Sequence, residues 1–223
     1  MSDQGNSWDR VPIDAQSINA PLSRTAVFLV VTVKDSPAAL AKAADALSSV
    51  SDLLKDVGFR DLSAHLSCIV GIGSALWDRL GMKKRPAELK RFEPIQGAKY
   101  NAPATPGDLL FHIRADRADL VFEFERILLD TLGDAVAVED EVSGFRYFDA
   151  RDLLGFIDGT ANPNGTDLPE ATQVGNEDPD FRGGSYIVVQ KYLHDLTAWG
   201  QVPVEQQEKI IGRTKLDNIE LDD

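Results

Sequence analysis

The order of strands and helices predicted for the first two thirds of the chain constrains its fold more than any other feature. An apolar, β-branched run at 24–34 predicts a strand. Apolar residues at helical spacing after Ser36 and Pro37 predict a helix that stops at Gly58. The same patterns predict strands at 62–73, 109–114 and 136–148, and helices at 74–80 and 119–132. Residues 81–107, rich in Lys, Pro and Gly, show neither pattern and are expected to be irregular.

Apart from the short helix at 74–80, these elements follow the order strand, helix, strand, strand, helix, strand. That is the order of the split βαβ, or ferredoxin-like, arrangement. It predicts an α+β fold in which two helices cover one face of an antiparallel sheet. We assign residues 24–150 to this first ferredoxin-like unit, and the polar, proline-broken residues 1–23 to an N-terminal arm.

The remainder, residues 151–223, is predicted to begin a second unit of the same kind. A long acidic loop at 161–183, of a length more typical of functional than of idle loops, comes first. A β-branched run predicts a strand at 185–192, and two short helices are expected at 195–199 and 203–211. One strand and two helices are an incomplete second unit.

Composition excludes several classes of function. Of the 223 residues 43% are hydrophobic, which is enough for a core, and 23 Lys and Arg against 36 Asp and Glu give a net charge of −13. So acidic a chain does not suit nucleic acid or an anionic membrane as partner. No window is long and apolar enough to span a bilayer, and the N-terminus lacks the pattern of a secretory signal. The lone Cys68, among apolar neighbours, predicts a buried thiol, and a cytoplasmic location is expected.

One stretch, Gly155 to Thr160, places a carboxylate, Asp158, between two glycines. Glycine allows a positive φ or a close approach of the backbone to a ligand. Phe156 and Ile157 are expected to give Asp158 an apolar setting, which raises the cost of its charged form. Asp-Gly and the Asn-Pro that follows are also ordinary turn signals. The stretch alone therefore fits either a turn or a site.

Other candidates are sparse. The three histidines, His65, His112 and His194, have no second histidine or cysteine at metal-ligand spacing, so no metal site is predicted. Arg213 follows the helix stop at Gly212 and is either a surface arginine or a group that binds an anion such as a carboxylate. No zinc-protease, Cys-x-x-Cys, phosphate-loop or Gly-x-Ser-x-Gly motif is present.

The stretch Gly155–Phe156–Ile157–Asp158–Gly159–Thr160 resembles the Gly-x-x-Asp-Gly signature of the dye-decolorising (DyP-type) haem peroxidases. Five further segments resemble the bacterial B-type branch of that family: 66–71, 106–113, 144–148, 178–186 and 211–215. The resemblance covers nearly the whole chain. It implies two ferredoxin-like halves with haem b between them.

The resemblance also implies roles for individual residues. Asp158 is similar to the distal aspartate on the peroxide side of the haem. Ile157, Gly159 and Thr160 are similar to residues that line the haem edge. Arg213 is similar to the arginine beside a haem propionate, where a guanidinium matches a carboxylate.

Two departures from the family pattern limit these expectations. The family's proximal histidine and distal arginine lie beyond the acidic stretch at 215–223, so the iron ligand is expected outside the given chain. Many relatives have Glu at the position of Ala161, which leaves manganese binding without support.

The resemblance implies a haem-dependent peroxidase that reduces hydrogen peroxide and oxidises dyes, phenolic compounds or other bulky donors. Tyr186, Tyr192 and Trp199 either pack in the core or relay electrons to such donors. Two alternatives stay open: a haem carrier or iron-releasing, deferrochelatase-like protein, and a haem-free truncated chain without activity. The family further implies a homo-oligomer and, for some members, packaging inside an encapsulin shell through a C-terminal tail.

Overall fold

The computed structural model describes residues 18–20 and 22–222, so most of the predicted arm at 1–23 lies outside the described residues. The chain divides into two units. The first comprises Met1–Gly144 and Pro169–Tyr186, and the second comprises Phe145–Leu168 and Ile187–Asp223. The loop that follows the Asp158 stretch is thus shared between the two units.

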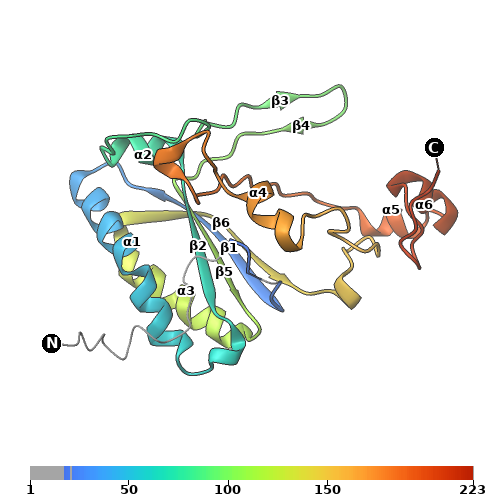
Figure 1. The fold of residues 1–223 in the computed structure, drawn as a ribbon, viewed down its shortest axis with the longest axis horizontal. Coiled ribbons are helices and arrows are strands. Elements are labelled where there is room, and N and C mark those ends of the chain that lie inside the picture. Colours follow the sequence, from blue (N-terminus) through green and yellow to red (C-terminus); the bar gives the residue numbers. More distant parts are fainter. Residues whose placement is uncertain (1–17, 21, 223) are drawn as a thin grey trace. The chain divides into compact units, whose positions relative to one another are not determined.

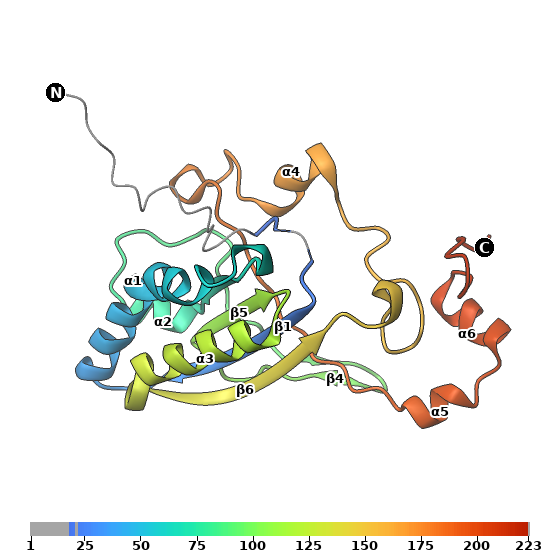
Figure 2. The ribbon, with the colours of Figure 1, turned by 90° about the horizontal axis from the view of Figure 1, so that it is seen from below.

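The first unit is built on a four-stranded sheet with the strand order β2-β5-β1-β6. Its strands are β1 (Thr25–Val33), β2 (Ser67–Ile72), β5 (Leu109–Ala115) and β6 (Val136–Phe145). The two central strands, β1 and β5, run antiparallel to each other, and β5 also runs antiparallel to β2. Helices α1 (Pro37–Gly58) and α3 (Ala118–Leu132) lie on the same face of this sheet in both views (Figures 1 and 2). The predicted ferredoxin-like arrangement is confirmed.

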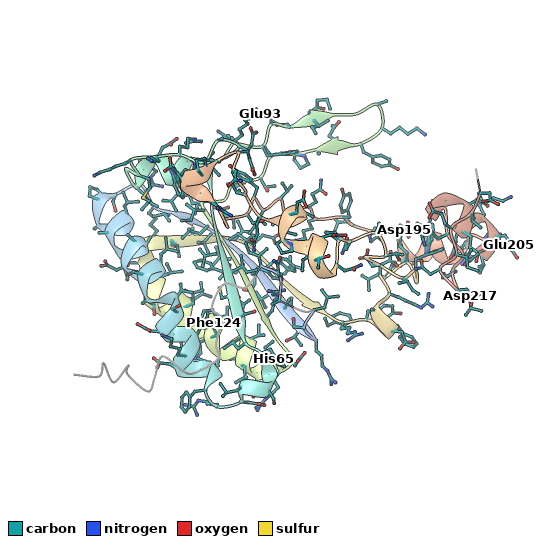
Figure 3. The ribbon with its side chains drawn as sticks, in the orientation of Figure 1. His65, Glu93, Phe124, Asp195, Glu205 and Asp217 are labelled. Atoms are coloured by element: carbon teal, nitrogen blue, oxygen red, sulfur yellow. The ribbon has the colours of Figure 1, made fainter. Side chains whose placement is uncertain are left out.

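The core of the first unit lies between the sheet and these two helices. Alternate residues of β1 are buried, among them Leu29 and Val31, as expected for a strand with one covered face. They share one buried apolar cluster with Leu54 of α1 and Phe124 of α3, which Figure 3 labels. Burial of each such side chain stabilises the fold by roughly 1.5–3 kcal/mol. Packing of the two amphipathic helices against the sheet therefore supplies the buried apolar contacts of the first unit.

Helix α1 begins where its sequence predicts. The Ser36 hydroxyl accepts a hydrogen bond from the Ala39 amide at 3.1 Å, and Pro37 occupies the first turn, where its missing N–H costs nothing. The short helix α2 (Ser74–Arg79) and helix α3 also match their predicted positions within a residue or two.

The strand predicted at 62–73 is wrong over its first five residues. Residues Leu62–Ala64 form a 3₁₀ turn, η2, because the Asp61 carboxylate caps the Ser63 amide at 3.1 Å. His65 then adopts a left-handed conformation with φ 51°, so the extended chain of β2 starts only at Ser67. A local side-chain cap overrides the strand pattern here.

Residues 81–107, expected to be irregular, contain a small β-hairpin. Strand β3 (Ile95–Gln96) pairs antiparallel with β4 (Asn101–Ala102). A Cβ at Gly97 would lie 2.4 Å from the Tyr100 carbonyl oxygen, so the turn between the strands requires glycine there. Two-residue strands are too short to produce an alternating pattern, which is why this hairpin was not predicted.

The strand predicted at 185–192 is also wrong. Its residues pair with no strand in the part of the chain that the structure describes, and Val188 is 75% exposed. β-Branched composition favours an extended chain, but a strand exists only where a neighbour completes its hydrogen bonds. The expected loop at 161–183 carries three short turns: η5 (Gly165–Asp167), α4 (Leu168–Thr172) and η6 (Pro179–Phe181).

The second unit contains a short 3₁₀ turn, η4 (Phe148–Ala150), and the two predicted helices, α5 (Leu196–Gly200) and α6 (Val204–Ile211). Asp195 caps α5 by accepting the Ala198 amide at 2.9 Å, and Gly212, at φ 81°, ends α6. Among the residues described, no helix has both the length and the apolarity to cross a membrane.

Candidate functional site

The Asp158 loop in the second unit is closed by the carboxylate of Asp152. Its Oδ1 accepts the amides of Leu154 at 2.9 Å and Phe156 at 3.0 Å, and its own amide donates to the Phe156 carbonyl at 2.8 Å. An isolated antiparallel bridge between Arg151 and Ile157 lies next to this turn. The short chain before Asp158 is therefore held by its own hydrogen bonds.

Arg151 ties the loop to the chain that follows α6. Its Nη1 donates to the Gly155 carbonyl at 2.9 Å and to the Lys215 carbonyl at 2.6 Å. Its Nη2 donates to the Leu216 carbonyl at 3.2 Å. Sequence reasoning missed both Arg151 and Asp152, since a charged residue in a loop carries no signal for its backbone partners.

Phe156 anchors the loop in the small core of the second unit. Its ring is buried, meets the Trp199 ring edge-on at 6.3 Å between centroids, and has Lys215 Nζ 5.3 Å from its centroid. Trp199 Nε1 in turn donates to the Leu154 carbonyl at 3.0 Å. Trp199 therefore packs against the loop.

Asp158 itself is exposed at the surface of this unit, so the apolar setting expected for it is wrong. Phe156 turns into the core, and Ile157 is only half-buried. Asp158 Oδ1 accepts the Gly159 amide at 2.7 Å, and Gly159 has φ 74° within a turn closed by Asn162 N–H to its carbonyl. Oδ2 makes no hydrogen bond to any residue that the structure describes. The turn thus presents one carboxylate oxygen outward.

Thr160 and Arg213, 53 positions apart in the sequence, are joined through a third residue, Asn218. Asn218 Nδ2 donates to Thr160 Oγ1 at 2.8 Å. Its Oδ1 accepts Arg213 Nε at 2.8 Å, and its carbonyl accepts Arg213 Nη2 at 3.0 Å. The remaining guanidinium nitrogen, Nη1, pairs with Glu220 at 3.3 Å. The structure therefore brings the Asp158 turn and Arg213 into one hydrogen-bonded group.

Asn218 was not singled out from the sequence. It adopts φ 57°, a left-handed conformation in which asparagine is several-fold enriched among residues other than glycine. In the sequence, Asn218 is only an asparagine in a polar loop after α6. Such residues are too common to identify a site.

None of the three histidines belongs to this hydrogen-bonded group. In the first unit, His65 Nδ1 is 3.3 Å from Asp116 Oδ2, and His112 stacks on Phe28 with the ring centroids 4.3 Å apart. Burial lowers the pKa of His112 to about 4, and the charge of Arg114 adds to that shift. His194, in the second unit, lines an apolar hollow beside α5. Within the described ranges, no three His, Cys, Asp or Glu side chains form a cluster that could hold a metal ion.

Comparison with protein families matches both parts of the chain. A model described as "Dyp-type peroxidase, N-terminal" matches residues 15–146, and one described as "Dyp-type peroxidase, C-terminal" matches residues 149–223.

Curated relatives agree with these matches. The chain is 54% identical over 212 residues to a dye-decolorizing peroxidase of Mycolicibacterium paratuberculosis, covering 95% of this chain and 59% of the relative. It is 53% identical over 211 residues to a dye-decolorizing peroxidase of Mycobacterium tuberculosis, covering 95% and 62%. The chain thus spans about three fifths of the length of these relatives. A deferrochelatase of Yersinia pestis is more distant, at 29% identity over 68% of this chain and 39% of the relative.

Solved structures share the fold. DyPB from Rhodococcus jostii RHA1 superposes with a TM-score of 0.92 at 52% identity, covering 95% of this chain and 68% of that one. The encapsulated DyP-type peroxidase from Mycobacterium smegmatis gives a TM-score of 0.90 at 53% identity, covering 94% and 67%.

Proposed function

The chain belongs to the Dyp-type peroxidase family, and we propose that the protein is a haem-dependent peroxidase. It reduces hydrogen peroxide and oxidises dyes, phenolic compounds or other bulky electron donors. The observation that carries the proposal is the outward-facing carboxylate of Asp158, in one hydrogen-bonded group with the guanidinium of Arg213. Two relatives more than 50% identical to the chain are dye-decolorizing peroxidases, which supports the same activity.

The residues present fit haem b as the cofactor. A variant of DypB from Rhodococcus jostii RHA1, 52% identical to this chain, is known in complex with haem. Among the described residues, Arg213 Nη1 pairs with Glu220 alone, whose side chain is 80% exposed, and such a surface ion pair contributes little. A propionate can take the place of Glu220 and accept a charge-assisted hydrogen bond. Ile157, Gly159 and Thr160, none of them fully buried, remain available to line the haem edge.

When bound, haem supplies the iron redox chemistry that cleaves the O–O bond of hydrogen peroxide. Asp158 moves the proton that this cleavage requires. Its Oδ2 accepts a proton from one oxygen of hydrogen peroxide and returns it to the other, which leaves as water. That transfer needs the carboxylate within ~3 Å of the peroxide, directly or through one water. Oδ2 suits this role because Oδ1 is already engaged by Gly159.

We infer that the iron ligand is none of the three histidines of this chain. His65 pairs with Asp116, and the half-buried His112 is stacked on Phe28. His194 is exposed, and its position, like those of the other two, does not match that of the family's proximal histidine. The proximal ligand, as expected from the family pattern, then comes from outside the given sequence.

The test is a comparison of two activities on the full-length protein reconstituted with haem. We expect turnover of an anthraquinone dye that depends on hydrogen peroxide, with no iron released from the haem. Release of iron with an intact porphyrin, and no peroxide-dependent dye turnover, would instead support the deferrochelatase-like alternative that the distant relatives represent.

We further propose that the protein is a homo-oligomer housed in an encapsulin compartment of the cytoplasm. The support is its 53% identity to a peroxidase that is itself encapsulated. Co-expression with the encapsulin of the same organism tests this: the peroxidase should co-purify inside the shell, and a peroxidase found only in the unassembled fraction would contradict it.

A further inference from the structure

Between α2 and β5 of the first unit, hydrogen bonds hold residues 84–89, which we call the base of the segment. Trp77 Nε1 donates to the Lys84 carbonyl at 3.0 Å, and Arg85 Nη2 donates to the Leu89 carbonyl at 2.9 Å. The Ala87 amide donates to Asp178 Oδ2 at 2.9 Å. The base also pairs with Tyr186, whose hydroxyl accepts the Glu88 amide at 2.9 Å. These bonds fix the position of the chain from which the β3–β4 hairpin starts.

Beyond this base the chain forms an arm, residues 90–103, which carries the β3–β4 hairpin and extends beyond the four-stranded sheet (Figure 1). Every residue of the arm is exposed. In Figure 3 its side chains, which begin near Glu93, stand apart from those packed around Phe124 in the core. Apart from the Lys90–Glu88 ion pair, the hydrogen bonds that the arm makes to described residues lie within the hairpin.

An isolated two-stranded hairpin is marginally stable at best in water. This one has strands of only two residues, yet it carries large apolar side chains: Ile95 is 60% exposed and Tyr100 is 86% exposed. Large exposed apolar side chains on so short a projecting hairpin are typical of a contact surface. We therefore expect a partner surface to cover the apolar side chains of the arm.

The charge of the arm indicates what covers it. Residues 90–103 contain three Lys or Arg and one Glu, a net charge of +2. The remaining 20 Lys or Arg and 35 Asp or Glu give the rest of the chain a net charge of −15. Lys99 and Arg91 make no ion pair with any described residue. A basic, apolar arm on an acidic protein is complementary to the surface of another copy of that protein.

We propose that the arm docks onto the acidic surface of a second copy of this chain and holds the two copies together. Arg91 and Lys99 supply the attraction between the copies. Ile95 and Tyr100 supply the apolar contact. The inference names the surface that forms the oligomer and does not depend on the Asp158 chemistry.

The test uses sedimentation velocity of the full-length protein over a range of concentrations and salt. The variant Arg91→Glu/Lys99→Glu should raise the dissociation constant of self-association about tenfold or more. A second variant, Ile95→Ser/Tyr100→Ser, should weaken association without changing its salt dependence. The control Lys55→Glu/Arg60→Glu makes the same change in net charge at two exposed positions near the end of α1, and should associate as the wild type does.

Hydrogen exchange of the wild-type arm gives an independent readout that needs no variant. The amides of 95–102 should become protected only at concentrations at which the protein associates. Protection that persists in the monomer would show that another part of the same protein covers the arm, and would overturn the proposal. A wild type that stays monomeric, or an Arg91→Glu/Lys99→Glu variant that associates as the wild type does, would also overturn it. Peroxide turnover measured in parallel separates this result from the proposed activity.

Discussion

Asn218 holds the guanidinium of Arg213 with two acceptors at once, its side-chain oxygen at 2.8 Å from Nε and its carbonyl oxygen at 3.0 Å from Nη2. Two of the three guanidinium nitrogens are thereby fixed within the protein. Only Nη1 is left for an exchangeable surface partner, at present Glu220. An arginine positioned in this way is pre-organised to receive a carboxylate at one corner.

Removal of the Asn218 side chain should therefore weaken the site without abolishing the fold. Asn218→Ala loses the hydrogen bonds to Arg213 Nε and to Thr160, and a hydrogen bond to a charged group contributes about 1.5–3 kcal/mol. We expect haem affinity, measured by Soret titration of the apoprotein, to fall about tenfold. The control Asp217→Ala changes an exposed neighbour whose side chain makes no hydrogen bond to a described residue, and it should bind haem as the wild type does. Unchanged affinity in Asn218→Ala would remove Asn218 from the site.

Glu125 of α3 should make the stability of the first unit depend on pH. The residue is 8% exposed, and its Oε1 has no hydrogen-bond partner among the described residues. Burial, together with the charge of Glu141, raises its pKa above the ordinary 4.5. A raised folded-state pKa stabilises the fold below the unfolded pKa, and that contribution is lost as pH rises through the folded value. Glu125→Gln should therefore raise the melting temperature at pH 8 and have little effect at pH 4.

The matched control is Glu123, two residues earlier on the same helix. Its hydrogen bond from Arg126 lowers its pKa, so its ionised form stabilises the fold at neutral pH. Glu123→Gln should leave the melting temperature at pH 8 unchanged or slightly lower. An increase of the same size in both variants would show that total charge, and not burial, is responsible.

Cys68 should be unreactive in the folded protein. It is fully buried in β2, and desolvation raises the pKa of its thiol to about 12, so almost no thiolate exists at pH 8. The Cys68 peptide should be alkylated by iodoacetamide only as fast as the first unit unfolds, and equally fast with and without hydrogen peroxide. Rapid labelling of Cys68 under native conditions would contradict the core described for β2.

Phe156 should be the main apolar anchor of the second unit. It and Gln207 are the buried residues of that unit in the described part of the chain, and Trp199 packs on its ring. Phe156→Ala should cost about 3 kcal/mol in the stability of this unit. The fluorescence of Trp199, measured in a variant in which the other two tryptophans are Phe, should shift to the red at lower denaturant concentration. An unchanged transition would mean that other residues hold the loop.

Most strands and helices of the first unit could be predicted because each one is marked by residues within its own segment. Ser36 caps α1, alternate apolar residues mark β1, and periodic apolar residues mark α3. The predictions failed where the outcome depends on a partner. The run at 185–192 has strand composition but no strand beside it, and the hairpin at Gly97 depends on a single turn.

The candidate site divides in the same way. Asp158 stood out as a carboxylate between two glycines, the family resemblance added Gly159 and Arg213, and all three lie in one unit of the structure. Asp152 and Arg151 hold that group together through backbone amides and carbonyls, and Asn218 does so through both its side chain and its carbonyl. Such bonds link positions up to 65 residues apart and leave no pattern in the sequence. The apolar setting expected for Asp158 is wrong because Phe156 turns inward, while Asp158, two residues later, stays at the surface.

The central claim is that Asp158 moves the proton during reduction of hydrogen peroxide. Its most direct test is the second-order rate constant for reaction of the haem-loaded, full-length protein with hydrogen peroxide, measured by stopped-flow absorbance. Asp158→Asn, which cannot accept the proton, should lower this constant about 10²–10⁴-fold while leaving haem content and the Soret spectrum unchanged. Asp167→Asn, the same change at another exposed carboxylate of the unit, should react as the wild type does. A rate constant for Asp158→Asn equal to that of the wild type at every pH would contradict the role assigned to Asp158.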